Sequence, residues 1–148
     1  MKHLISALVV LLSTAAQSQI QLTPLQENEI TYGCGCSFHL HNRPAEVSNI
    51  ILMWEVGEAA KMRINGKSVS LHVSESKSDT KPGVREKVGD RTVYELKATH
   101  WSVKVDCRAT KVCAGDSTSC ESTSYVGQVL VTSPSTRKVF EVHGTCGC

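Results

Sequence analysis

Cysteine and histidine are the residues of this chain whose chemistry and spacing are most informative. The segment Cys34-Gly35-Cys36-Ser37-Phe38-His39 is mirrored by His143-Gly144-Thr145-Cys146-Gly147-Cys148, and the residue numbers of each mirrored pair add to 182. An antiparallel strand pair requires such a constant sum, because a step forward on one strand is a step back on its neighbour. The sequence therefore predicts that these two segments pair as antiparallel strands.

Four of the seven cysteines face one another in this predicted strand pair. Cys34 would face Cys148 and Cys36 would face Cys146 at non-hydrogen-bonded positions, where a Cα separation of about 4.5 Å suits a disulfide. We therefore expect two bridges that join the ends of the chain. One alternative is a zinc or copper(I) site made of the four thiolates. Another is a bridge within each Cys-Gly-Cys unit, a small and easily reduced ring that would suit a redox role.

The other three cysteines lie in the second half of the chain. Cys113 and Cys120 flank a polar turn between two predicted strands, and we expect them to form a disulfide across its base. Cys107 is then left over. It falls on the apolar face of a predicted strand, which indicates a small core residue. A reactive thiol, or exchange of its place with Cys113, is the alternative.

The same register places histidines on the opposite side of the strand pair from the cysteines. His39 would face His143, and His41 would face Glu141. Three imidazoles and a carboxylate on one surface patch could bind Zn²⁺ or Cu²⁺. The simpler interpretation is a set of solvated surface side chains without a cofactor.

Catalytic motifs are absent from the sequence. There is no Gly-x-Ser-x-Gly, no His-Glu-x-x-His, no glycine-rich phosphate loop and no cysteine with an obvious general base. We therefore expect a protein that is not an enzyme.

Apolar and polar residues alternate with period two through most of the chain, as in strands with one buried and one exposed face. The clearest run extends from Trp101 to Thr110. Eight strands are predicted, at Cys34–His41, Ile50–Val56, Ala59–Ile64, Lys67–Val73, Arg91–Ala98, Trp101–Thr110, Thr123–Thr132 and from Thr136 to His143 with its tail. An antiparallel meander whose last strand pairs with its first needs an even number of strands. The fold class is therefore all-β, a small closed antiparallel barrel of about eight strands, with a β-sandwich as the alternative.

Three local signals complete the expected fold. Asn65-Gly66 between two alternating runs predicts a tight hairpin. Thr23-Pro24-Leu25-Gln26 has the form of a helix start, so one short helix should precede the first strand. The polar stretch from Ser74 to Val88 is predicted to be a mobile loop.

Residues 1–18 have the pattern of a secretory signal peptide. Lys2 and His3 precede an apolar run, and small residues around Ala16 and Ser18 suit cleavage after either of them. Residues 19–148 would then form a single all-β domain that is secreted or periplasmic, where cysteines tend to pair. The apolar run is too short to span a bilayer, and no later stretch is long enough to do so.

Charge composition restricts the partners. Without Lys2, the 15 basic and 14 acidic residues give a net charge of +1, and the two signs are interleaved. A nucleic-acid partner is therefore not expected. The partner is an unknown protein or small ligand.

Residues Met62 to Leu71 contain a strand, an Asn-Gly turn and a second strand. In this respect the chain resembles the small periplasmic barrels that inhibit C-type lysozyme. The resemblance implies a barrel fold and makes a periplasmic enzyme inhibitor one functional alternative. The inhibitory loop of that family, a Ser-Gly segment followed by an aromatic residue, has no counterpart here.

The sequence thus favours an exported, disulfide-stabilised β-barrel with a binding or structural role. The alternatives are a copper or zinc binding protein, an enzyme inhibitor of the lysozyme-inhibitor type, and a thiol-disulfide participant that uses the Cys-Gly-Cys ends.

Overall fold

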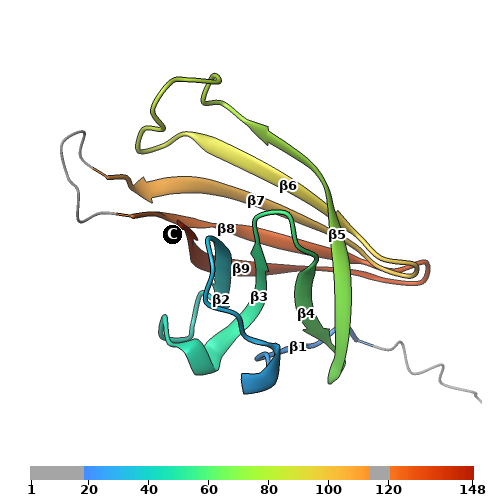
Figure 1. The fold of residues 1–148 in the computed structure, drawn as a ribbon. Coiled ribbons are helices and arrows are strands. Elements are labelled where there is room, and N and C mark those ends of the chain that lie inside the picture. Colours follow the sequence, from blue (N-terminus) through green and yellow to red (C-terminus); the bar gives the residue numbers. More distant parts are fainter. Residues whose placement is uncertain (1–18, 114–120) are drawn as a thin grey trace, which may run out of the picture.

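The computed structural model describes residues 19–113 and 121–148. Nearly all of its regular structure consists of strands, whose side chains alternate between two faces. Within these residues there are nine strands and two single turns of 3₁₀ helix (Figure 1). The strands are β1 (Leu22–Thr23), β2 (Gly35–Leu40), β3 (Ile50–Glu55), β4 (Ala60–Ile64), β5 (Lys67–Ser78), β6 (Arg91–Lys97), β7 (Ser102–Lys111), β8 (Ser122–Thr132) and β9 (Arg137–Gly147).

Strands β2 to β9 form a closed antiparallel barrel. Each strand pairs with the next one in the chain, and β9 returns to pair with β2. The long strands β5–β9 cover one side, and the shorter strands β2–β4 cover the other (Figure 1). The predicted barrel of eight strands is confirmed, and the chain does not adopt the sandwich alternative.

The β2–β9 pair has the register that the constant sum of 182 predicts. Cys36 lies opposite Cys146 and His39 lies opposite His143. The structure contains the disulfides Cys34–Cys148 and Cys36–Cys146, with Cα–Cα distances of 4.0 and 4.1 Å. Residues almost a full chain length apart are therefore covalently joined neighbours. Cys107 is free and buried, and the Cys113–Cys120 bridge falls outside the description because Cys120 is not among the described residues.

One face of each strand fills the barrel. Phe38, Leu52 and Met62 of β2–β4 meet Val105 and Val129 of β7 and β8, and all five side chains are fully buried. Within residues 19–113 and 121–148, no charged side chain belongs to the core cluster. Burial of apolar side chains on the inner face therefore favours the register in which the predicted apolar residues point inward.

The N-terminal segment differs from its prediction. Thr23 belongs to the two-residue strand β1, which pairs with the end of β4, and the helix is reduced to a 3₁₀ turn at Glu27–Glu29. The capping box is present but begins at Gln26 instead of Thr23. Pairing with β4 competes with the local helix signal, and a strand of two residues is too short to show a period in the sequence.

Among the described residues, no helix is both long enough and apolar enough to span a membrane.

The stretch predicted as a mobile loop is largely held in place. Its first part, to Ser78, belongs to β5, which runs further than expected. In the loop that follows, Asp90 accepts hydrogen bonds from Thr80 Oγ1 and the Lys87 amide, at 2.7 and 2.9 Å. Gly89 and Asp90 bond the Ala109 backbone of β7. This loop is therefore held by hydrogen bonds within itself and to the backbone of β7. At Asn65-Gly66, by contrast, both residues have positive φ, which confirms the predicted tight turn.

Gly144 of β9 packs on the Phe38 ring across the strand pair. A Cβ atom at this position would lie 2.5 Å from Phe38 Cδ1 and would also meet the Ser37 carbonyl oxygen. Gly144→Ala should therefore destabilise the protein by about 1–3 kcal/mol, as overpacking of a core does. Thr145→Ala, one residue further on the exposed face, is the control and should change stability by less than about 0.5 kcal/mol. Urea denaturation measures both, and equal stability of the two variants would contradict the packing argument.

Candidate functional site

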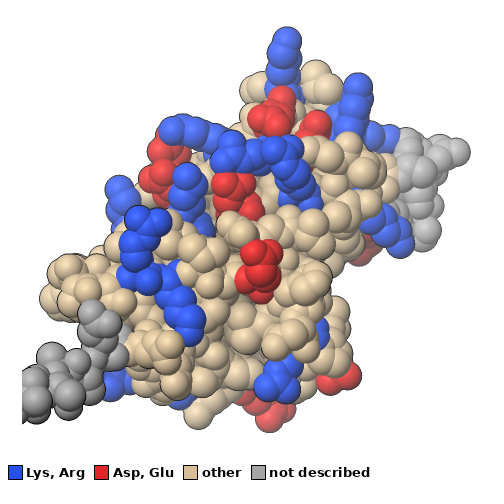
Figure 2. Space-filling model, turned by 180° about the vertical axis from the view of Figure 1, so that it is seen from behind, with Lys and Arg blue, Asp and Glu red and all other residues tan. Residues whose placement is uncertain are grey.

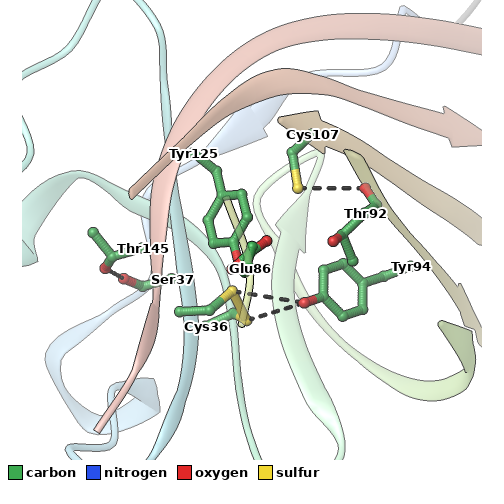
Figure 3. Close-up of a disulfide and its surroundings, with 9 residues drawn as sticks. Cys36, Ser37, Glu86, Thr92, Tyr94, Cys107, Tyr125 and Thr145 are labelled. Atoms are coloured by element: carbon green, nitrogen blue, oxygen red, sulfur yellow. Dashed lines mark hydrogen bonds between the residues drawn. A yellow bond between two sulfur atoms is a disulfide. The ribbon is translucent and has the colours of Figure 1, made fainter. Parts of the chain in front are cut away.

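The barrel interior beside the Cys36–Cys146 disulfide is occupied by aromatic rings. The Tyr94 hydroxyl lies 4.0 Å from Cys36 Sγ and 3.9 Å from Cys146 Sγ (Figure 3). The Trp54 ring meets Tyr94 edge-on at 5.0 Å between centroids, and Phe38 stacks on Trp54 at 5.7 Å. These contacts fill the space that a ligand inside a small barrel would need.

A carboxylate enters the same region from the loop between β5 and β6. The Tyr125 hydroxyl donates to both oxygens of Glu86, at 3.0 and 2.8 Å (Figure 3). Burial, followed by this contact with Glu86, raises the pKa of Tyr125. The phenol therefore stays protonated at neutral pH, and the pair fastens the loop to β8.

Cys107 lies nearby but is chemically quiet. Its thiol donates to the Thr92 carbonyl oxygen at 3.5 Å, and burial raises its pKa to about 12. Burial likewise raises the pKa of Tyr94 to about 12. Because the thiolate is the nucleophilic form of cysteine, Cys107 is a core residue and not a reactive thiol.

The histidines of the predicted patch lie close together, but the imidazoles of His39 and His143 are hydrogen-bonded to backbone carbonyl groups. His39 and His143 stack at 5.2 Å between ring centroids, and His41 meets His143 edge-on at 6.4 Å. His39 Nε2 bonds the Glu46 carbonyl oxygen and His143 Nε2 bonds the Arg43 carbonyl oxygen, at 3.1 and 2.9 Å. The two imidazoles therefore fasten residues 41–49, the connection between β2 and β3, to the outer face of the barrel.

The fourth predicted metal ligand, Glu141, is engaged elsewhere. Its carboxylate accepts a hydrogen bond of 2.6 Å from Gln128 Nε2 on β8, while its backbone pairs with His41 as the register predicts. Within residues 19–113 and 121–148, no group of three His, Cys, Asp or Glu side chains is arranged to hold a metal ion. Zinc or copper binding by His39, His41, Glu141 and His143 stays a prediction.

His39 also corrects one expectation. His39 lies on the outward face, as the alternation of side chains along the strand predicts. Only 6% of its surface is exposed, because residues 41–49 cover it. The alternation of side chains assigns each one to a face of the sheet, but it cannot reveal a loop that folds over that face.

Two adjoining grooves lie on this outer face, over β2, β9 and β8. The first has a volume of about 330 Å³, and the second about 450 Å³. Both are lined by Ser37, Thr145 and Ile50 from the strands and by Val47 from the covering segment. We call the two grooves together the trough.

The floor of the trough is an ordered array of polar side chains. Ser124, Thr145 and Ser37 form one row across the three strands, because each lies opposite the next. The next row along the strands consists of Val126, His143 and His39. Neighbouring strands are about 4.8 Å apart and successive rows about 7 Å apart, so the groups are regularly spaced.

Acidic side chains and the side chains of lysine and arginine are absent from this array. Among the described residues that line the two grooves, the imidazoles of His39 and His143 are the basic groups, and none is Asp, Glu, Lys or Arg. On β6 and β7 the outer face is charged instead, with Arg91 paired to Asp106 and Glu95 opposite Lys104. Figure 2 shows charged side chains crowded over one part of the molecule beside a broad uncharged area.

On the floor of the trough, sequence reasoning singled out only His39 and His143 as candidate site residues, and it missed Ser37, Ser124 and Thr145 as well as the walls. Tyr32, which is 81% exposed, and Val47 lie outside the strands and carry no periodic signal. Comparison with known proteins adds no function: no protein-family model, curated protein or solved structure was found to match this chain.

Acid should weaken the fold through His39. Burial and, next, the neighbouring His143 lower the pKa of His39 below 6.5. The unfolded chain therefore binds more protons than the folded one in weak acid, so this contribution to stability is complete above about pH 6.5 and is lost as the pH falls towards the folded pKa. His39→Gln should flatten the decrease in the free energy of unfolding between about pH 7 and 5, measured in urea. His100→Gln, in an exposed turn, is the control; the same slope for wild type and His39→Gln would refute the assignment.

Proposed function

We propose that this chain is an exported, non-enzymatic binding protein that holds an uncharged ligand in the trough outside β2, β8 and β9. The observation that carries this proposal is that the described lining of the trough has no Asp, Glu, Lys or Arg side chain, on a barrel whose interior is occupied by side chains. A rigid barrel with a packed core is well suited to present such a surface, since binding then orders few groups.

The chemistry of the trough defines the ligand. Hydroxyls of Ser37, Ser124 and Thr145 donate and accept hydrogen bonds, whereas Val47 and Tyr32 offer apolar surface beside them. A charged ligand would lose its hydration without gaining an opposite charge. An uncharged oligosaccharide meets both requirements, because its hydroxyl edges bond such a row and its C–H faces pack on aliphatic and aromatic side chains.

Titration with cellohexaose, maltohexaose and chitohexaose tests the proposal. We expect at least one of them to shift the backbone amide NMR signals of Ser37, Ser124 and Thr145. Ser37→Trp should fill the trough and weaken that binding at least about tenfold, whereas Ser102→Trp, exposed at the start of β7, should bind as wild type does. The proposal fails if none of the three sugars moves these signals, or if Ser37→Trp binds as well as the control.

Export rests on the signal pattern of residues 1–18 and accords with the two disulfides. When the full chain is expressed in a bacterium that secretes proteins, the mature N-terminus should be Gln17 or Gln19, after cleavage behind Ala16 or Ser18. Mass spectrometry of the exported fraction measures this mass. Recovery of the uncleaved chain from the cytoplasm alone would contradict export.

A further inference from the structure

The two disulfides that join β2 and β9 lie in different surroundings. Cys36 is 7% exposed, and its bridge to Cys146 packs beside Tyr94 in the core. Cys34 and Cys148 are both exposed, at the rim of the barrel where β2 begins and β9 ends. We call these the core bridge and the rim bridge. Cys146 of the core bridge is partly buried, whereas both cysteines of the rim bridge are exposed. A thiol from solution therefore reaches the rim bridge more readily than the core bridge.

We infer that the rim bridge Cys34–Cys148 is an exchangeable disulfide that reacts with a cysteine-containing partner while the core bridge keeps the barrel closed. The rim bridge borders the first groove of the trough, but the inference does not depend on oligosaccharide binding there. The chemical class of the partner is a peptide segment with a thiol, or with two thiols where the exchange runs to completion.

The fold tolerates opening of the rim bridge. The β2–β9 ladder has six residue pairs between Gly35 and Leu40 on one strand and Val142 and Gly147 on the other, and the core bridge lies within it. Breaking the outer sulfur bond therefore leaves both strands paired and covalently joined. No core residue gains solvent contact from this change alone.

The two rim cysteines are also held by bonds other than their disulfide. The Cys34 carbonyl oxygen accepts from the Val56 amide at 2.8 Å, and the Cys148 amide donates to the Glu121 carbonyl oxygen at 3.0 Å. Their Cα atoms are 4.0 Å apart in the closed state. After reduction the two thiols stay close together, so the bridge can form again readily.

A partner segment has a path to the bridge. The first groove of the trough is lined by Cys148 together with Gly33, Gly35 and Gly147, which carry no side chains. Tyr32 lies beside them and is exposed. A peptide lying in this groove would bring a cysteine sulfur alongside the rim bridge, next to a part of the lining that carries no side chains.

The exchange is a two-step substitution at sulfur. A partner thiolate forms a bond to one rim sulfur, the Cys34–Cys148 bond breaks, and the other rim sulfur leaves as a thiolate that takes up a proton. A second partner thiol then attacks the mixed disulfide and releases the first rim cysteine as a thiol. The partner is oxidised to a disulfide by two electrons, and the rim bridge is reduced to two thiols. Cys107 takes no part, because it is buried and bonded to the Thr92 carbonyl oxygen.

Stepwise reduction tests the inference. The oxidised protein is incubated with increasing dithiothreitol, trapped with N-ethylmaleimide without denaturant, and mapped by mass spectrometry. Cys34 and Cys148 should become alkylated at dithiothreitol concentrations at least tenfold below those that open Cys36–Cys146, while the circular dichroism spectrum stays unchanged. Reduction of both bridges together, earlier opening of the core bridge, or loss of the fold on opening the rim bridge would each overturn it.

A mixed disulfide identifies the reacting sulfur. A synthetic peptide of uncharged residues with one cysteine, activated as its 2-pyridyl disulfide, is offered to Cys34→Ser and to Cys148→Ser, which each keep one rim thiol. The adduct should accumulate on that thiol, because no second rim thiol is present to displace the peptide, and the doubly substituted Cys34→Ser, Cys148→Ser protein should form none. Adding Cys107→Ala to either single variant is the matched control and should leave the reaction unchanged. Equal labelling of the double variant would reject the assignment of the reacting sulfurs. If that variant fails to fold, the order in which the two bridges of the wild-type protein are reduced tests the inference instead.

Discussion

The pairing of β2 with β9 is the constraint on which the rest of the structure depends. A sheet of eight strands has two edges, whose unpaired amides and carbonyls would be open to other chains. Joining β9 to β2 removes both edges and requires residues separated by 110 and 114 positions to meet. Closing so long a loop is costly in entropy, which is why covalent bridges at this seam are effective.

This one register also divides the chemistry of the molecule between two faces. Cys36, Phe38 and Gly144 point inward, where Tyr94 and Trp54 occupy the interior. The alternating residues, such as Ser37 and Thr145, point outward and form the floor of the trough. A shift by one residue would put hydroxyls and imidazoles into the core. The packed interior and the polar exterior are therefore two results of the same pairing.

The strands, their order and the β2–β9 register could be predicted because they follow from periodicity and from facing residue numbers. His39 was placed on the correct face, but its burial depends on residues 41–49, whose position has no repeating signal. The same holds for β1 and for the loop that brings Glu86 to Tyr125. Each is fixed by contacts between distant segments that no periodic or mirrored pattern in the sequence marks.

Two bridges at one seam are more than stability requires. On the chain-entropy model a loop of about 100 residues gives about 4.7 kcal/mol when first closed, and a second bridge two residues further along closes a loop that is already closed. Either bridge alone would thus provide most of the entropic gain. Because Cys36 is buried, whereas Cys34 and Cys148 are both exposed, we assign the stabilising role to Cys36–Cys146. On the inference above, Cys34–Cys148 can then open and close while the core bridge keeps the barrel closed.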